Sequence, residues 1–331
     1  MDSKWRRRAP VIALLLLAPI VAEVLYGATR LSAIFVLIPE IGDWGCGALM
    51  IRYAARRWRL AWPGMLLLGL ALAIAEECII QQTSLAPLTG LAQAEYGRMW
   101  GVNWVYLIWA LGYEAVWVVL VPVQLVDLMF PARREEPWIG RGGFARAVTF
   151  FGIAAFLAWY MWTQRARTMI FHMPPYNPPM LYLAAAMAVI VALIVAAHRL
   201  RNRRSISQSP TPRPWFAGLA ICLLSIPWCA LVMLGYGVAP EIPPAWVIAA
   251  SLVWAIVPLF LMYRWSFTAG WQDVHRYAAV CGAIAGTMLG GYVMFALGGA
   301  LRMDWIGKIA FNLIAAVWLA RGPRPKASEA L

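Results

Sequence analysis

Residues 61–80, AWPGMLLLGLALAIAEECII, form an apolar run that carries two adjacent acidic residues near its end, Glu76 and Glu77. At a rise of 1.5 Å per residue, about 20 residues cross the roughly 30 Å of hydrocarbon in a bilayer. This run therefore predicts a transmembrane helix. Further spans are predicted at residues 9–27, 33–51, 102–128, 147–163, 179–198, 215–236, 245–263, 277–299 and 305–320.

The overall composition supports a membrane protein. Of the 331 residues, 63% are hydrophobic and 13% are charged, whereas soluble domains are about half apolar and a quarter charged. These values exclude a soluble globular domain and a disordered chain. The sequence predicts an all-α, polytopic bundle of about ten transmembrane helices in a bacterial-type cytoplasmic (inner) membrane.

The net charge of +13 would favour nucleic-acid binding in a soluble protein. Here most Lys and Arg residues lie in short links between apolar runs, where they orient helices and meet anionic headgroups. We therefore expect the lipid bilayer as a partner and no nucleic acid. The distribution of basic links predicts that both termini lie inside. The basic N-terminus resembles a secretory signal, but the apolar stretch continues without a clean cleavage site, which predicts a retained first helix.

We divide the chain into four parts. Residues 1–130 hold the first four predicted helices, residues 131–198 hold the fifth and sixth, residues 199–214 are a basic cytoplasmic linker, and residues 215–331 hold the last four helices as a scaffold. In the ninth span, Gly282, Gly286 and Gly290 form a seam of small residues. Such a seam favours close packing with another helix, either within the chain or in a homo-oligomer.

Acidic residues are concentrated in the first four predicted spans. Carboxylates within a bilayer are costly and usually face a bundle interior, water or a partner. Helical rise puts five of them about 12 to 24 Å from the inner boundary, which predicts a carboxylate-lined cavity in helices 1–4. The alternative is that they only fix helix packing by bonding to backbone or indole groups. The acids in these spans are Glu23, Glu40, Asp43, Glu76, Glu77, Glu114 and Asp127, of which Asp127 is expected to be an ordinary interface residue.

The second predicted span is irregular in sequence. Residues 38–47 read IPEIGDWGCG, and one proline and three glycines in this stretch favour a broken or kinked helix. Broken helices at membrane depth tend to line cavities. Glu40 and Asp43 would share a face if the segment stays helical. A kinked helix that serves only packing is the alternative.

The Glu76–Glu77 pair is the most specific local feature. Adjacent helical residues point about 100° apart, so one of the two is expected to face the site directly. Gln81 lies four residues beyond Glu77 and is expected to orient it. Asn103 and Glu114 of the next span are expected to supply its partners.

The pair resembles the CPBP group of glutamate-type intramembrane proteases, which includes the CAAX prenyl endopeptidases. That family's pattern is Glu-Glu-x-x-x-Arg followed by two His motifs. This chain has Gln81 at the position of the Arg and Tyr113-Glu114 in the helix that would carry the first His motif. The resemblance, which covers about residues 61–130, implies that Glu76 or Glu77 activates water as a general base.

Three functions therefore stay open: a proton- or cation-coupled transporter, an intramembrane hydrolase, and a non-catalytic assembly protein. The candidate catalytic residues are Glu76, Glu77 and Glu114. The candidate substrate- or ion-binding residues are Glu23, Glu40, Asp43, Gln81 and Asn103. The sequence identifies no metal and no cofactor, since it contains no HExxH motif, phosphate loop or nucleotide fingerprint.

Overall fold

A computed structural model describes residues 3–89, 93, 95–201, 210–233, 236, 239–297 and 299–322. The described chain is almost entirely helical, and its strands β1 (Arg98–Met99) and β2 (Val102–Asn103) form one short antiparallel pair. The α-helices are α1 (Ser3–Pro19), α2 (Leu37–Glu40), α3 (Cys46–Arg57), α4 (Trp62–Ala75), α5 (Trp104–Tyr113), α6 (Val121–Met129), α7 (Arg141–Trp159), α8 (Arg167–Met169), α9 (Met180–Arg199), α10 (Pro214–Met233), α11 (Pro244–Ser266), α12 (Asp273–Leu297) and α13 (Arg302–Arg321).

Several of these helices continue through short segments of different pitch. Wider, π-helical turns occur at η1 (Ile20–Val24), η3 (Ile41–Gly45), η4 (Glu76–Ile80), η5 (Glu114–Leu120) and η7 (Tyr160–Ala166), and tighter 3₁₀ turns occur at η2 (Leu31–Val36) and η6 (Pro131–Arg133). The segment before α3 is the most irregular, because η2 contains a kink at Ala33 and is followed by α2 and then by η3. The irregularity that residues 38–47 predict is present as the π-helical turn η3, but the helix is not broken there, and the kink lies earlier, at Ala33.

Among the residues that the structure describes, eight helical stretches are long and apolar enough to cross a membrane. They are Leu31–Arg57, Trp62–Ile80, Trp104–Met129, Arg141–Met169, Met180–Arg199, Pro244–Ser266, Asp273–Ala296 and Arg302–Arg321. The predicted spans at 9–27 and 215–236 coincide with helices outside this set. The first belongs to a helix that begins with basic residues, and the second contains a shorter apolar helix, Pro214–Cys229. The count of ten and the orientation stay predictions.

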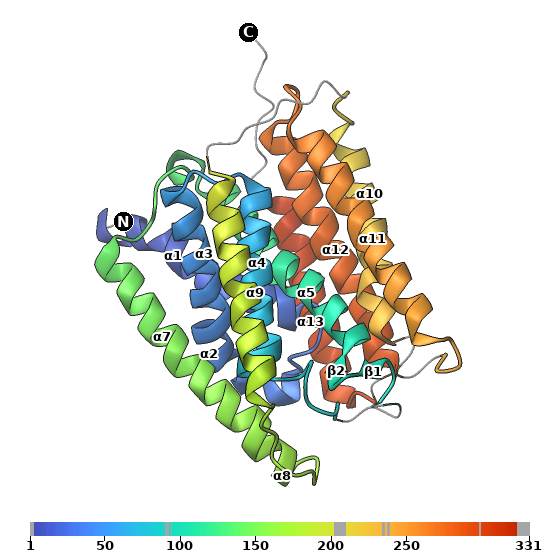
Figure 1. The fold of residues 1–331 in the computed structure, drawn as a ribbon. Helices are drawn as coiled ribbons and strands as arrows, with labels where there is room; N and C mark the ends of the chain where they lie inside the picture. Colours follow the sequence, from blue (N-terminus) through green and yellow to red (C-terminus); the bar gives the residue numbers. More distant parts are fainter. Residues whose placement is uncertain are drawn as a thin grey trace.

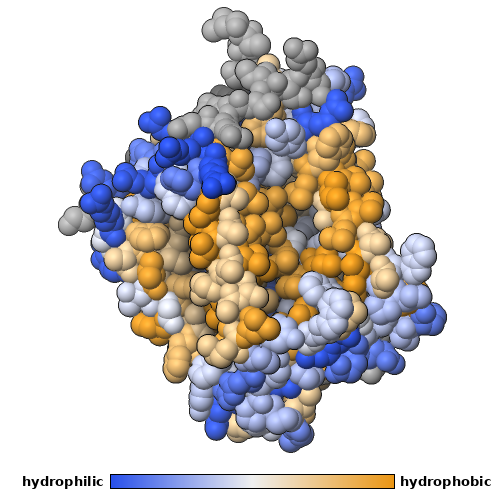
Figure 2. Space-filling view, in the orientation of Figure 1, coloured by the Kyte–Doolittle hydropathy of each residue, from blue (hydrophilic) through white to orange (hydrophobic). Residues whose placement is uncertain are grey.

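The predicted inside and outside links lie at opposite ends of the bundle. Arg134, in the link after α6, pairs with Asp273 at the start of α12, with 2.6 Å between their charged atoms. At the other end, the Tyr96 hydroxyl donates to the Ile242 carbonyl in the link before α11 (2.7 Å). Figure 2 shows hydrophobic side chains across the middle of the visible face and hydrophilic ones toward both ends. This arrangement is the one that membrane-crossing helices require.

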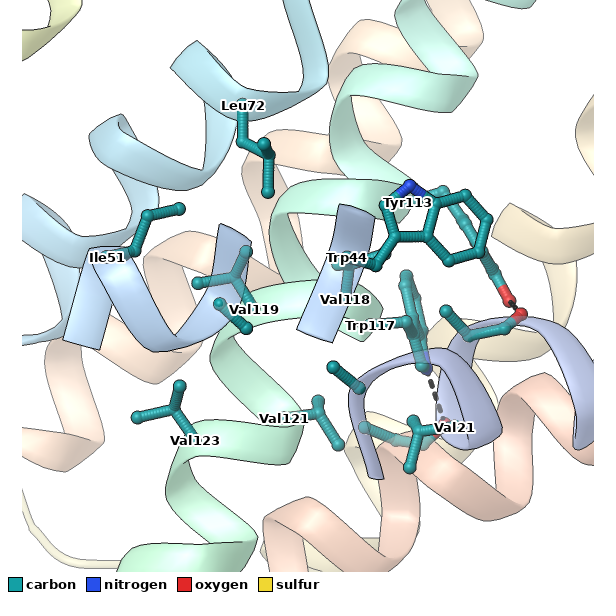
Figure 3. Close-up of a cluster of buried hydrophobic side chains, with 14 of the residues drawn as sticks. Val21, Trp44, Ile51, Leu72, Tyr113, Trp117, Val118, Val119, Val121 and Val123 are labelled. Atoms are coloured by element: carbon teal, nitrogen blue, oxygen red, sulfur yellow. Dashed lines mark hydrogen bonds between the residues drawn. The ribbon is translucent and has the colours of Figure 1, made fainter. Parts of the chain in front are cut away.

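The helices form two groups that lie side by side in Figure 1. One group contains α1 to α4, α7 and α9, and the other contains α10 to α12, with α5 between them. The η5–α6 segment lies at the centre of the hydrophobic core, and Val118, Val119 and Val123 are inaccessible to solvent. Figure 3 shows them clustered with Ile51 of α3 and Leu72 of α4.

The glycine seam of α12 packs against α10 of the same chain. A Cβ added at Gly282 would lie 2.1 Å from the Gly218 carbonyl oxygen, and one at Gly290 would lie 2.4 Å from the Cys229 Cβ. The two helix backbones therefore approach so closely that only glycine fits. Of the two partners considered for the seam, the structure places a helix of the same chain there.

Candidate functional site

The acidic residues of the first half lie on π-helical turns. Glu23 belongs to η1, Asp43 to η3, Glu76 and Glu77 to η4, and Glu114 to η5. A π-helical turn widens the helix and changes the direction of the side chains that it carries, and such turns are frequent at functional sites. Four different helices thus present carboxyl groups from locally altered backbone.

Two small residues let these turns approach one another. A Cβ at Gly45 in η3 would lie 2.5 Å from the Leu15 carbonyl oxygen of α1. A Cβ at Gly69 in α4 would lie 3.1 Å from the Ala115 Cα of η5. Any larger side chain at these positions would separate helices whose acidic residues must meet. The close packing is therefore part of how the sequence assembles the site.

The first part of the site is a pair of carboxyl groups joined by a hydroxyl. The Thr29 Oγ1 lies 2.6 Å from a Glu40 oxygen and 3.1 Å from a Glu23 oxygen. A threonine hydroxyl has one proton to donate. The Thr29 hydroxyl can therefore donate fully to only one of the two carboxyl groups. The other contact is either a second, shared acceptor of the same proton or a hydrogen bond that a protonated carboxyl group donates to the Thr29 oxygen.

The second part is the pair formed by Asp43 and Glu76, whose carboxyl groups lie within hydrogen-bonding reach of each other. Glu76 is 0% exposed, and neither of its oxygens accepts a bond from a conventional donor within the described residues. Two carboxylates at this distance repel each other strongly unless a proton or cation lies between them. Neither carboxyl group forms an ion pair with a Lys or Arg of the described residues.

The third part is the pair formed by Glu77 and Glu114, which also lie within hydrogen-bonding reach of each other. The Ser84 hydroxyl donates to a Glu77 oxygen over 2.7 Å. Glu114 is in addition close enough to Asp43 and Glu23 to experience their charge. The second and third pairs are therefore coupled.

The six carboxyl groups form one connected set. Glu23 and Glu40 are partly exposed, whereas Asp43, Glu76, Glu77 and Glu114 are buried. None of the six forms an ion pair with a Lys or Arg within the part of the chain that the structure describes. The set thus runs from partly accessible acids to a fully enclosed one without a neutralising cation.

Gln81 and Asn103 lie outside this set. The Asn103 amide donates to the carbonyls of Thr83 and Ala86 (2.8 and 2.6 Å) and its oxygen accepts from Arg98 (2.8 Å). These bonds stabilise the segment that joins η4 to α5, so the Asn103 amide bonds to this loop and not to the acidic residues. Gln81 lines a small recess together with Arg167, on the outside of the loop.

Two residues that sequence reasoning did not select, Thr29 and Ser84, belong to the site and supply the hydroxyls described above. Hydroxyl residues give a weak sequence signal, because Ser, Thr and Tyr are common in membrane helices and loops. Only the fold identifies which of them reach the carboxyl groups.

Lys308 is the one lysine that falls inside a predicted span, and it binds backbone and not acid. Its Nζ donates to the carbonyls of Leu25, Tyr26 and Met288 (2.5, 2.9 and 3.2 Å). Leu25 and Tyr26 follow directly after η1, where the first helix ends. The ammonium group therefore satisfies carbonyls that a helix end leaves without partners.

The expectation that Asp127 is an ordinary interface residue is wrong. Asp127 is buried, and its Oδ1 accepts from the Nε and Nη2 of Arg52 (3.0 and 2.8 Å), while its Oδ2 accepts from Arg56. Arg52 also donates to the carbonyls of Arg134 and Glu136, and its guanidinium lies 3.1 Å from the centroid of the Trp138 ring. Arg52, which lies within α3, is thus the centre of a buried ion-pair cluster.

A cavity of about 1190 Å³ lies between α4, α5, η5 and α6 on one side and α10, α11 and α12 on the other. None of the six connected carboxyl groups lines it. The sequence predicts one carboxylate-lined cavity in helices 1–4, but the structure separates this large cavity from the acids by the η5 segment. Helices α10, α11 and α12 and the link before α12 supply about half of the lining residues.

Within the described residues, no group of three His, Cys, Asp or Glu side chains could hold a metal ion. Comparisons with protein-family models, with curated proteins and with solved structures find no match to this chain. The resemblance of residues 61–130 to the CPBP group therefore stays a prediction, and the function has to be argued from the geometry.

Proposed function

We propose that the protein is a proton-coupled membrane transporter and that the six connected carboxyl groups bind and pass the coupling protons. The observation that carries this proposal is the continuity of the set, from the partly exposed Glu23 and Glu40 to the enclosed Glu76, without a paired cation. Acids inside a membrane commonly mark proton relays and ion pathways. A set of acids that served packing alone would be expected to bond to backbone and indole donors instead.

The pairs define a route for a proton. A proton that enters at Glu23 or Glu40 is shared through the Thr29 hydroxyl. The Asp43–Glu76 and Glu77–Glu114 pairs are the next acceptors, and the charge of each pair changes the proton affinity of the other. Each pair can hold one proton between two oxygens, so a proton leaves one pair only when the next can accept it.

Coupling to a second solute is provided by η5. Glu114 is the first residue of this π-helical turn, while Val116, Trp117 and Leu120 of the same turn line the large cavity. A change in the charge of Glu114 alters the hydrogen bonding of a segment whose other side forms the cavity wall. Such a segment can link proton occupancy on one side to solute binding on the other.

Proton binding can be measured without knowing the solute. The purified protein is reconstituted into liposomes on a sensor surface, and a rapid pH step is applied. Protons that bind within the membrane produce a transient current. We expect this current in the unmodified protein and a reduction to under about a tenth in the Glu76→Gln/Glu114→Gln variant, since only one acid would remain in each pair. Glu241→Gln, an exposed acid in the link before α11, is the matched control and should leave the current unchanged.

Two results would overturn the proposal. The first is the absence of a transient current at every pH, with variants that change only the melting temperature, which would favour the assembly protein. The second is cleavage of a membrane-embedded peptide by the purified protein that is lost in Glu77→Gln, which would favour the hydrolase.

A further inference from the structure

The large cavity has the dimensions and chemistry of a lipid site. Its volume of about 1190 Å³ exceeds the range of about 300 to 1,000 Å³ that drug-sized ligands occupy. Figure 2 shows a hollow in the visible face, lined by hydrophobic side chains, between α9 and α11. A cavity of this size on the side of a membrane bundle can admit a molecule from the bilayer.

The interior wall presents apolar surface. Most of the lining side chains are apolar, and leucine is the most frequent among them, as in Leu70, Leu120 and Leu259. The indoles of Trp117 and Trp254 also line it, but their N–H groups donate to the carbonyls of Ala283 and Leu224 (3.0 and 2.8 Å). The protein therefore uses these two donors itself, whereas the N–H of Trp228, which also lines the cavity, has no acceptor among the described residues. The ring faces and the aliphatic side chains make the wall mainly apolar, which indicates a long apolar chain.

The inner mouth of the cavity is basic. Arg56, Arg59, Arg134 and Arg276 line it together with Asp127 and Glu135. Asp127 is already shared by Arg52 and Arg56, and Asp273 is shared by Arg134 and Arg276. Arg59 is exposed and forms no ion pair with a described residue. Even after these pairings, the guanidinium groups outnumber the carboxylates, and the mouth carries net positive charge.

We infer that the cavity binds an anionic phospholipid of the bilayer, with its headgroup among Arg59, Arg134 and Arg276 and its acyl chains against η5 and α11. Guanidinium groups suit this headgroup because they bind phosphate through paired hydrogen bonds. The apolar wall lies deeper in the bundle than this basic mouth, which is the arrangement that an amphiphile requires. That this lipid is also the transported solute rests on the proposed function, whereas its binding does not.

Binding is tested with a phosphatidylglycerol that carries a photoreactive diazirine near the end of one acyl chain. The protein is reconstituted in nanodiscs of phosphatidylcholine with a small fraction of this probe, illuminated, digested and analysed by mass spectrometry. We expect labelling on the cavity wall at η5 and α11. Unlabelled phosphatidylglycerol should compete about tenfold better than phosphatidylcholine, because each guanidinium near the headgroup favours an anionic lipid severalfold.

Two pairs of variants separate headgroup recognition from chain binding. Arg59→Gln/Arg276→Gln should remove most of the tenfold preference, and Arg146→Gln, an exposed arginine at the same end of the bundle on α7, should keep it. Ala255→Trp should fill the cavity and suppress labelling, whereas Ala250→Trp, on the exposed side of α11, should not.

The results also distinguish this inference from the proposed function. Labelling spread over the exposed faces of α7 and α9 with equal competition by both lipids would mean ordinary boundary lipid and would overturn the inference. If that occurs while the proton current still depends on Glu114, the proposed function stands alone. Cavity labelling that persists in Glu114→Gln, in a protein without a proton current, would support the lipid site and overturn the transporter.

Discussion

Buried charges are arranged differently at the two ends of the η3–α3 and η5–α6 segments. The η3–α3 segment carries Asp43 near one end and Arg52 near the other, and the η5–α6 segment carries Glu114 and Asp127 in the same order. At the end that the sequence predicts to be the inner one, called the inner end below, the acid and the base meet in a saturated ion-pair cluster. At the opposite end, called the outer end, acids meet other acids.

This difference indicates which charges are structural. Every nitrogen of the Arg52 guanidinium donates a hydrogen bond, although its side chain is only 1% exposed. Nothing is left there for a ligand. The outer acids retain oxygens without donors among the described residues, as in Glu76 and Glu114. Buried polar groups without partners are destabilising, so a protein that keeps them is expected to use them.

The largest effect is expected when the inner cluster is broken. Arg52→Met leaves Asp127 buried with only Arg56 as its partner, and removal of one member of a buried ion pair typically costs about 3–5 kcal/mol. We expect a loss of this size in the free energy of unfolding, measured by denaturant titration in detergent micelles.

The matched control for Arg52 is a double variant. Arg52→Met/Asp127→Leu removes both charges, and it should recover most of the lost stability, because well-packed apolar groups replace buried ion pairs at little cost. A double variant no more stable than Arg52→Met would show that the guanidinium acts mainly through its bonds to the Arg134 and Glu136 carbonyls.

A smaller loss is expected at Lys308. Lys308→Met removes the donor of the Leu25, Tyr26 and Met288 carbonyls, of which the first two are buried, and buried acceptors left without partners cost about 1–3 kcal/mol. The same denaturant titration should show a loss in this range, while Arg302→Met, an exposed cation at the start of the same helix, should show almost none. An equal loss in both variants would contradict a specific role for the Lys308 ammonium.

Substitution at the outer end should have the opposite sign. Glu76→Gln is almost isosteric and gives Asp43 a donor, so we expect the free energy of unfolding to rise by about 1 kcal/mol. Glu95→Gln, at an exposed acid in the segment before β1, should leave it unchanged. A clear loss of stability in Glu76→Gln would mean that the carboxyl group of Glu76 is needed for packing, which would weaken the contrast between the two ends.

The smallest effect is expected for an exposed ion pair beside the inner cluster. Arg133 and Glu136 lie 3.1 Å apart and are both substantially accessible. Glu136→Gln should change the free energy of unfolding by less than about 1 kcal/mol, because solvent screens such pairs. A change in the free energy of unfolding as large as that of Arg52→Met would show that burial does not determine how much an ion pair contributes to stability.

Much of the helical plan could be predicted from local pattern. The run at residues 61–80 and most of the other apolar runs correspond to helices. They could be predicted because a helix that crosses the bilayer needs about 20 apolar residues, and such a run is visible in the sequence. The acids of the first half were also visible, since a charge in an apolar run stands out. The burial of Asp127 could not be predicted, because Asp127 lies near the end of an apolar run, where acids are usually exposed. Its burial depends on the bonds from Arg52, which only the fold brings close to it.

The partners of the acids could not be predicted in the same way. Asn103 and Gln81 are near the acids in sequence, yet they bond to the loop or line its outer side. Thr29 and Ser84 bond to Glu23 and Glu77, which lie on π-helical turns, and no sequence pattern signals such turns. The large cavity depends on residues more than 100 positions apart, such as Leu70 and Leu259.

By itself, the sequence determined an all-helical chain suited to a membrane, with acids in its first half and a glycine seam in its second, because apolar length, charge and side-chain size are local properties. Only the tertiary structure decided that the acids pair with one another, that Arg52 and Asp127 neutralise each other, and that the large cavity lies on the opposite side of η5. Those outcomes depend on which helix faces meet, and this is set by packing between segments far apart in the chain.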